Sequence, residues 1–191
     1  GEHINKLPGV LISEKIGLTS DISCIKGCEL LIFGIPSSFI RSVAKQAEPS
    51  LPNNQVIVNV AKGIEDETYL TLSEILNEVL PGRNISVLSG PSHAEEVVKG
   101  IPTTVVVGST TKETARYIQD IFMNDSFRVY ISPDIIGIEL GGAIKNVIAL
   151  AAGIVDGLGL GDNTKAALMT RGLAEISRLG VAMGGKLETF S

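Results

Sequence analysis

A lysine inside an apolar helix is the strongest candidate for chemistry in this sequence. Lys145 lies in the segment ELGGAIKNVIALAAG, between Ile144 and Val147. Burying an ammonium group costs on the order of several kcal/mol unless a partner or a function compensates. Gly141 and Gly142, one turn earlier, each weaken a helix by ~1 kcal/mol relative to alanine, but they allow a ligand or another backbone to approach. The pattern predicts that Lys145 exchanges a proton with a ligand.

Two structural explanations for Lys145 stay open at this point. One is a buried ion pair with Glu139 or with another acid. The other is an ammonium group that reaches solvent along the helix surface. Residue types alone do not decide between them and a functional lysine.

A second lysine follows an apolar strand in the segment NVAKG. Lys62 directly follows the strand, and Gly63 permits an unusual backbone turn. Ligands of open α/β sheets bind at the carboxyl ends of strands, where a lysine can present a point charge to a phosphate or carboxylate. A solvated surface lysine explains the same letters equally well.

The segment LSGPSHAEEV places polar groups at another strand end. Gly90 and Pro91 end the strand, and Ser92 and Ala94 begin a helix whose free N–H groups suit an anion. His93 has no carboxylate or serine partner in the motif, and a helix N-terminus disfavours the imidazolium form. We therefore do not assign catalysis to His93.

The segment FGIPSSF is a third turn from a strand to a helix. Phe39 can form a flat wall for a cofactor ring, so Pro36 and Phe39 are cofactor-binding candidates. The alternative is that Ser37 or Ser38 caps the following helix and that Phe39 belongs to the core.

These candidates lie at the ends of predicted elements. Short apolar runs alternate with amphipathic segments between residues 29 and 132, the rhythm of an α/β sheet. The predicted strands are residues 29–36, 55–63, 85–90, 103–109 and 127–132. The predicted helices between them are residues 37–48, 68–80 and 111–123. Runs such as VIVNV indicate strands covered on both faces, as in a mostly parallel sheet, although the last two strands could pair differently.

The pattern changes after residue 132. Two long helices are predicted at 134–155 and 163–182, joined by DGLGLGDN, with Asp162 or Asn163 as the cap of the second helix and Lys165 in solvent. The sequence therefore predicts an α/β domain over residues 1–132 and a helical domain over residues 133–191.

Composition restricts the class of protein. The chain has 191 residues, 44% of them hydrophobic, which can supply a globular core. Sixteen basic residues against 21 acidic ones give a net charge of −5, which excludes a nucleic-acid partner. Cys24 and Cys28 form an unaccompanied C-x3-C pair, which indicates reduced thiols, and no secretory signal is visible. Both observations favour the cytoplasm.

The apolar run that begins at Ile135 approaches the length of about 20 residues that spans a membrane. Glu139, Lys145 and Asn146 interrupt it. We expect a buried helix of a soluble protein and no membrane span.

Taken together, these segments resemble the NAD(P)-dependent glycerol-3-phosphate dehydrogenases, in particular the bacterial form. The resemblance covers nearly the whole chain and is carried by IPSSF, VAKG, LSGPSHAEEV, the long run from FRVYISPDIIGIELGGAIKN to GLAEISRLG, and ETF. It implies a Rossmann-like domain followed by an all-helical domain that assists dimerisation. It also implies NAD or NADP as cofactor, a homodimer, and interconversion of sn-glycerol 3-phosphate and dihydroxyacetone phosphate for phospholipid synthesis.

The resemblance also implies roles for single residues. Lys145 matches the family's catalytic lysine, the proton acceptor in glycerol phosphate oxidation. Lys62 matches a lysine that touches both cofactor and substrate. Gly90 and Ser92 match substrate-binding positions, and Ala94 matches a cofactor-binding one. His93 stands where many relatives carry phenylalanine.

The resemblance further implies an interior piece of a longer enzyme. A G-x-G-x-x-G loop after a strand is absent from these 191 residues, since GLGLGDN follows a helix and lacks the last glycine. We expect that loop before Gly1 and further substrate-binding residues after Ser191. Rival interpretations are a two-domain ketopantoate reductase or 3-hydroxyacid dehydrogenase, the latter relying on a His–Glu pair, and a non-catalytic nucleotide-binding module.

Overall fold

A computed structural model describes residues 2–3 and 7–190 of the chain. Its centre is a five-stranded sheet in the order β3-β4-β5-β6-β7. The strands are β3 (Leu30–Phe33), β4 (Val56–Asn59), β5 (Asn84–Ser89), β6 (Thr103–Ser109) and β7 (Phe127–Ser132). Strands β3, β4 and β5 are parallel, β6 runs antiparallel to β5, and β7 is parallel to β6. The predicted mostly parallel, Rossmann-like α/β sheet is therefore confirmed.

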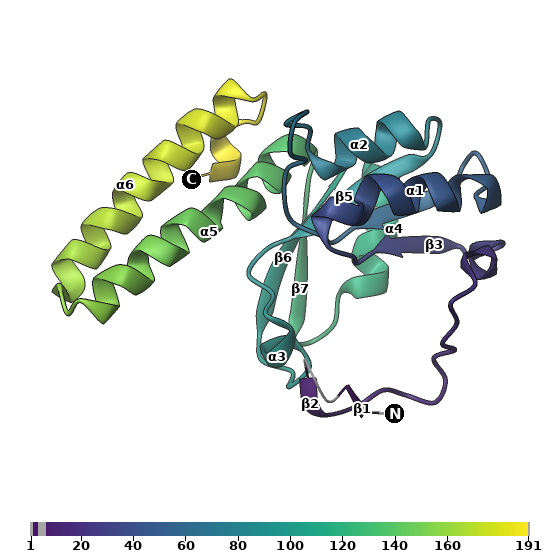
Figure 1. Ribbon diagram of the computed structural model, residues 1–191, viewed down its shortest axis with the longest axis horizontal. Helices are drawn as coiled ribbons and strands as arrows, with labels where there is room; N and C mark the ends of the chain where they lie inside the picture. Colours follow the sequence, from purple (N-terminus) through teal and green to yellow (C-terminus); the bar gives the residue numbers. More distant parts are fainter. Residues whose placement is uncertain (1, 4–6, 191) are drawn as a thin grey trace.

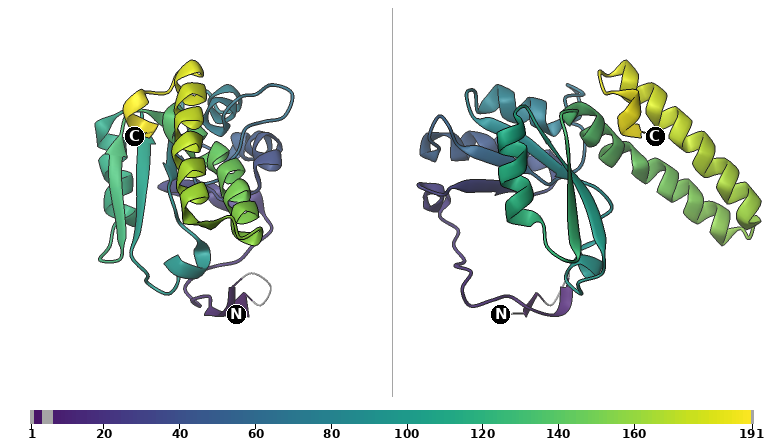
Figure 2. Two further views of the ribbon diagram at one scale, coloured as in Figure 1. Left: turned by 90° about the vertical axis from the view of Figure 1, so that its left-hand side faces the viewer. Right: turned by 180° about the vertical axis from the view of Figure 1, so that it is seen from behind.

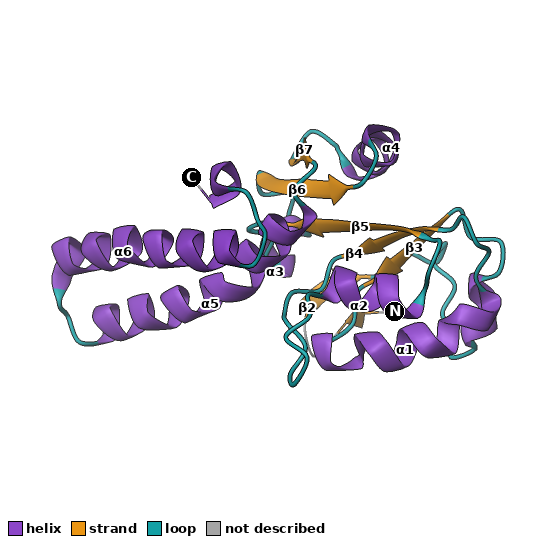
Figure 3. Cartoon of the chain, turned by 90° about the horizontal axis from the view of Figure 1, so that it is seen from above, coloured by secondary structure: helices purple, strands orange, loops and turns teal. Residues whose placement is uncertain are grey.

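Helices cover both faces of the sheet (Figure 3). Helices α1 (Ile40–Ala47) and α2 (Leu72–Val79) pack on one face around Ile57, and α4 (Lys112–Phe122) packs on the other around Val107. Helix α2 forms because a capping box of Thr71 and Glu74 satisfies its first N–H groups. Apolar residues three and four apart then direct one face to the core.

Two long helices project from the sheet as a hairpin (Figures 1 and 2). They are α5 (Ile135–Gly157) and α6 (Gly161–Ala182), and the chain turns between them where Gly159 and Gly161 adopt positive φ angles of 66° and 80°. The short 3-10 helix Leu187–Phe190 packs at the base of the hairpin, where the Phe190 ring lies against Gly180.

Asp134 ties the start of α5 to the end of the described chain. Its carboxylate accepts hydrogen bonds from the backbone N–H of Gly137 at 3.0 Å, from that of Lys186 at 2.8 Å and from the hydroxyl of Thr189 at 2.5 Å. Burial opposes the ionisation of Asp134. The three hydrogen bonds, of which that from Thr189 has the largest effect, outweigh burial and lower the pKa of Asp134. One carboxylate thus fixes where α5 leaves the sheet.

Several boundaries differ from the predictions. Helix α2 begins at Leu72, four residues later than predicted, because residues 64–71 form a loop closed by a bridge between Ile64 and Thr71. Helix α6 begins at Gly161, so the predicted caps Asp162 and Asn163 are wrong: Leu160 precedes the helix without a side-chain cap. Lys165, predicted to be solvated, forms an ion pair of 2.5 Å with Asp156.

Further short elements lie outside the central sheet. They include an antiparallel hairpin of β1 (Glu2–His3) and β2 (Leu7–Leu11), the short helix α3 (Ala94–Val97), and the 3-10 helices Ser37–Phe39 and Glu48–Ser50. The hairpin was not predicted. Cys24 lies in the 3-10 helix Ile22–Ile25, and both it and Cys28 are free and exposed.

Helix α5 is long and apolar enough to cross a membrane by length and composition, with a mean hydropathy of 1.6 in its most apolar window. Core helices of soluble proteins share those properties. Here residues 137–140 are buried, and Glu139 is hydrogen-bonded to Ser73 of α2. Only 28% of the apolar window is buried, however, so the prediction of a buried helix holds for its first turns and not for its second half.

Arg41 on α1 holds the loop that follows Lys62. Its guanidinium donates two hydrogen bonds of 2.7 Å to the Glu65 carboxylate and two, of 2.9 and 3.3 Å, to that of Glu78 on α2. Thr68 donates a third bond to Glu65, at 2.6 Å. The Arg41 guanidinium, with Thr68 adding to its effect, lowers the pKa of Glu65 to about 2.

The stability contributed by Glu65 should depend on pH. Because its folded pKa lies below its ordinary value of 4.5, the contribution is present above that value and is lost as the pH falls towards about 2. Glu65→Gln should therefore lower the melting temperature at pH 7 and lose its effect near pH 2, as measured by circular dichroism. Glu78→Gln is the control, since Glu78 is more exposed and should matter less. A gap between wild type and Glu65→Gln that persists at pH 2 would contradict this assignment.

Candidate active site

The turn before Lys62 is shaped by a buried amide. Asn59, the last residue of β4, accepts a hydrogen bond from the N–H of Ala61 and donates one to its carbonyl, both at 3.1 Å. This local ring directs the chain from the strand to Lys62, which is half-buried. Sequence analysis missed Asn59, whose signal was a lone amide in an apolar strand.

Gly63 brings two strand-end loops together. It has a φ of 150°, and a Cβ added to it would lie 2.8 Å from both side-chain atoms of Ser37. The loop after β3 and the loop after β4 therefore touch, which places the segment of Pro36 next to that of Lys62. Phe39 is 56% exposed, so its predicted alternative as a core residue is wrong.

The serines of this loop do not cap a helix. Pro36 and Phe39 occupy the positions before the 3-10 turn and before α1, and neither position has a side-chain cap. The helix-cap alternative for Ser37 and Ser38 is therefore also wrong. The exposed faces of Pro36 and Phe39 stay available to a ligand.

The end of β5 lies beside the start of α5. Gly90 follows Ser89 with a φ of 159°, and a Cβ there would lie 2.8 Å from the Thr104 carbonyl oxygen. A Cβ on Gly142 would lie 2.6 Å from Ser89 Oγ and 3.7 Å from Lys62 Cγ. Only a residue without a side chain lets α5 approach the strand end so closely. This outcome confirms that Gly142 permits a close approach.

Lys145, one turn beyond Gly142, lines a cleft of about 250 Å³ together with Ser89, Gly90 and Gly142. Lys62 does not line this cleft, but its Cγ lies 3.7 Å from the position that a Cβ on Gly142 would take. The structure therefore places Lys62 beside the cleft that Gly90 and Lys145 line, at the carboxyl ends of β4 and β5. Thr189 also lines this cleft and was not predicted, because it lies 44 residues further along the chain.

The positive charges of Lys145, in this cleft, and of Lys62, beside it, are not neutralised in the described ion pairs. Lys145 is half-buried, and neither it nor Lys62 takes part in an ion pair among the described residues. The predicted alternative of a pair between Lys145 and Glu139 is wrong, because the Glu139 carboxylate is bonded to Ser73. Burial, followed by the repulsion of Lys145, lowers the pKa of Lys62.

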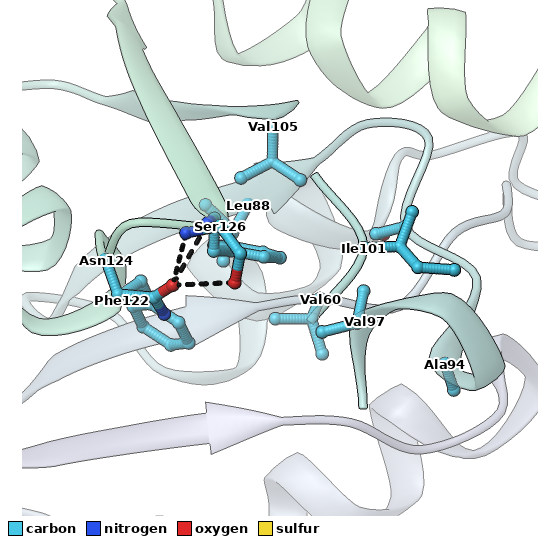
Figure 4. Close-up of a pocket in the computed structure, with 11 residues that line it drawn as sticks. Val60, Leu88, Ala94, Val97, Ile101, Val105, Phe122, Asn124 and Ser126 are labelled. Carbon is cyan, nitrogen blue, oxygen red and sulfur yellow. Dashed lines mark hydrogen bonds between the residues drawn. The ribbon is translucent and has the colours of Figure 1, made fainter. Parts of the chain in front are cut away.

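Ser92 and Ala94 line a different cavity, of about 430 Å³ (Figure 4). Leu88 and Val105 form its wall on the face of the sheet that α4 covers. Ser89 and Val106 face the lysine cleft, since neighbouring residues of a strand point to opposite faces. The structure therefore does not bring Ser92 and Ala94 into the cleft with Lys145, and His93 is exposed.

The cleft has the chemistry of a site for a small anion that exchanges a proton. The ammonium groups of Lys145 and of Lys62 beside it take part in no described ion pair and attract negative charge. A lysine side chain can also give or take a proton. No cluster of three metal-ligating side chains occurs among the residues that the structure describes.

Comparisons with known proteins agree with this geometry. The family model described as NAD-dependent glycerol-3-phosphate dehydrogenase N-terminus matches residues 1–115, and that described as the C-terminus matches residues 134–191. The glycerol-3-phosphate dehydrogenases [NAD(P)+] of Moorella thermoacetica and Fusobacterium nucleatum are each 57% identical over 192 residues. These alignments cover 100% and 99% of this chain and 57% of each relative. The chain thus spans little more than half the length of the curated relatives it matches.

Solved structures give the same result. The glycerol-3-phosphate dehydrogenase of Coxiella burnetii superposes with a TM-score of 0.90 at 35% identity, over 96% of this chain and 56% of that one. A ketopantoate reductase of Ralstonia eutropha, at 21% identity and a TM-score of 0.61 over 90% of this chain and 58% of that one, shares the fold alone.

The two neighbouring glycines of α5 should respond differently to alanine. Gly142→Ala places a methyl group against Ser89 Oγ and should destabilise the protein by about 1–3 kcal/mol through overpacking. Gly141→Ala is the matched control: its Cβ would lie 3.8 Å from the Phe190 ring, so it should be neutral or add up to ~1 kcal/mol of helix stability. Chemical denaturation measures both, and equal effects would refute the close contact at Gly142.

The two lysines should titrate as neighbours. Lys145→Met removes the like charge but keeps the bulk, so the pKa of Lys62 should rise, although burial still holds it below its ordinary value. The pH dependence of Lys62 acetylation, followed by mass spectrometry, measures this rise. Lys165→Met, which removes an ammonium paired with Asp156, should leave the profile unchanged. An unchanged Lys62 profile in Lys145→Met would show that the two ammonium groups do not interact.

Proposed function

We propose, from the premise that this chain belongs to the NAD-dependent glycerol-3-phosphate dehydrogenase family, that it is the interior of a longer enzyme. That enzyme interconverts sn-glycerol 3-phosphate and dihydroxyacetone phosphate and supplies glycerol phosphate for phospholipid synthesis. The observation that carries the proposal is the position of Lys62 beside the cleft that Lys145 lines at the strand ends, with neither lysine in a described ion pair.

A nicotinamide dinucleotide fits the residues at this edge of the sheet. The loops after β3 and β4 touch at Gly63 and Ser37, and the loop after β3 also carries the exposed ring of Phe39. We assign Pro36, Phe39 and Lys62 to the binding of NAD or NADP. Ala94 is a further cofactor-binding candidate, although it lines the cavity on the other face of the sheet. When bound, the cofactor supplies the hydride that reduces the substrate carbonyl.

Lys145 performs the proton transfer in this scheme. Negative charge develops on the carbonyl oxygen of dihydroxyacetone phosphate during reduction, and an ammonium group beside it stabilises that charge and then donates a proton. In the oxidative direction Lys145 accepts the hydroxyl proton, for which its amine must be neutral.

Lys62 and Gly90 hold the substrate. The Lys62 ammonium attracts the anionic groups of the ligand. The backbone at Gly90 adds contacts at the floor of the cleft. Ser92 is a further substrate-binding candidate, although it lines the neighbouring cavity, so its role would require movement of the segment that carries α3.

The organisation of the longer enzyme follows from the same premise. We assign residues 1–132 to the NAD(P)-binding domain and residues 133–191 to the start of the helical substrate and dimerisation domain. The exposed apolar residues of α5 and α6, such as Leu150 and Leu173, support a helical domain that is completed by further chain or by a second subunit. We place the enzyme in the cytoplasm as a homodimer.

Removal of Lys145 tests the proposal. In the full-length enzyme, Lys145→Ala should lower kcat for dihydroxyacetone phosphate by at least about 100-fold, because general acid–base catalysis contributes about that much. NADH binding, followed by fluorescence, should persist. The control is Lys165→Ala, which removes a lysine paired with Asp156 away from the cleft. Turnover retained by Lys145→Ala would exclude the proposed role, and turnover of ketopantoate but not of dihydroxyacetone phosphate by the wild type would exclude the proposed substrate.

A further inference from the structure

Glu139 is a buried acid that the proposed mechanism does not use. Its side chain is 6% exposed, and its hydrogen-bonding partners are neutral. Oε1 accepts the backbone N–H of Ser73 at 2.9 Å, and Oε2 accepts the Ser73 hydroxyl at 2.5 Å. Burial raises the pKa of Glu139, and the hydrogen bonds from Ser73 and Thr71 oppose that rise. A buried carboxylate held only by N–H and O–H donors is costly, so its position invites a functional explanation.

Ser73, the hydrogen-bonding partner of Glu139, is connected to Lys62 by a single closed loop. Ser73 is in the first turn of α2, directly after the loop that begins at Lys62. The bridge between Ile64 and Thr71 closes this loop, and the capping box of Thr71 fixes the start of the helix. The hydrogen bonds to Ser73 therefore attach α5 to the same rigid unit that carries Lys62.

On α5, Glu139 lies six residues before Lys145, which is about 9 Å along the axis. Between them Gly142 packs against Ser89 Oγ and the Lys62 side chain. The Gly142 contact limits how closely the helix approaches the sheet, and the Asp134 carboxylate holds its first turn, but neither contact involves α2. Two directional hydrogen bonds at Glu139 tie α5 to α2 and so restrict its rotation.

We propose that Glu139 is a positioning residue, which through Ser73 fixes the rotation of α5 and so sets the separation of Lys145 from Lys62. The kinetic side of this inference rests on the proposed dehydrogenase function. The required property is the reach of the side chain and its acceptor oxygen, rather than its negative charge.

Two substitutions of Glu139 in the full-length enzyme separate reach from charge. Glu139→Gln keeps the length: its oxygen can accept the Ser73 N–H, its amide can donate to Ser73 Oγ, and the Ser73 hydroxyl can then turn to Thr71 Oγ1, 3.3 Å away. Glu139→Asp keeps the charge but shortens the side chain by one methylene. Glu139→Gln should retain kcat/KM for dihydroxyacetone phosphate within about threefold, whereas Glu139→Asp should lose about 10- to 100-fold, mainly in kcat, because a shift of about 1 Å can cost that much.

A pair of buried serines provides the matched control. Ser73→Ala removes the hydroxyl bond to Glu139 and should lower kcat while leaving the Kd for NADH unchanged. Ser86→Ala removes a comparable buried hydrogen bond, 3.0 Å to Ser109 Oγ, in the first half of β5 and away from the cleft at Ser89. Both should lower the melting temperature, but only Ser73→Ala should change kcat. A merely structural role would make activity follow stability in both variants.

Acetylation of Lys62 supplies a readout that is independent of turnover. If wild type fails to reduce dihydroxyacetone phosphate, the proposed function fails, but Glu139→Asp should still shift the pH profile of Lys62 acetylation, while Glu139→Gln and Ser86→Ala should not. The inference is overturned if Glu139→Asp is at least as active as Glu139→Gln, if Ser73→Ala and Ser86→Ala behave alike, or if Lys62 acetylation is the same in both Glu139 variants.

Discussion

The repulsion between the ammonium groups of Lys62 and Lys145 is the constraint on which the rest of the site depends. Two half-buried ammonium groups that lie close together repel each other, so the backbone must hold them in place. Burial, followed by the repulsion of Lys145, lowers the pKa of Lys62. The supports are backbone-level devices. Asn59 closes the turn before Lys62, and Gly142 lets α5 approach the end of β5. Neither contact depends on a long, flexible side chain.

Helix α5 is buried against the sheet in its first turns and exposed in its second half. Its first two turns are buried against the sheet, where Asp134 fixes the start and Glu139 fixes the rotation. Its second half leaves the sheet and exposes Val147, Leu150 and Ile154. The helix is apolar along both halves and therefore resembles a membrane span in composition. Lys145 lies between the two halves, at the edge of the sheet. Lys145 stands at the transition, where the helix is still held and a ligand can already enter.

Sequence alone predicted the sheet, because strands follow from local rules. It did not predict that Lys145 of α5 lies beside Lys62. Apolar runs specify strands, and the carboxyl ends of parallel strands meet at one edge, which brings Lys62 near Gly90. The partner of Glu139 could not be predicted in this way. Ser73 is 66 residues distant and carries no charge, so no charge complementarity pointed to it. The N-cap prediction at Asp162 failed because the turn is made by Gly159 and Gly161, whose positive φ angles determine where α6 starts.

The separation of Glu139 from Lys145 has a chemical consequence. Had the carboxylate paired with the ammonium of Lys145, as the sequence allowed, it would have offset the positive charge that faces the cleft. The carboxylate is instead satisfied by Ser73, which leaves the charge of Lys145 to be compensated by a ligand. Among the described residues, no ion pair offsets the charge of Lys145. The hydrogen bonds that hold Glu139 at Ser73 therefore leave this ammonium open to an anionic ligand, as the proposed function requires.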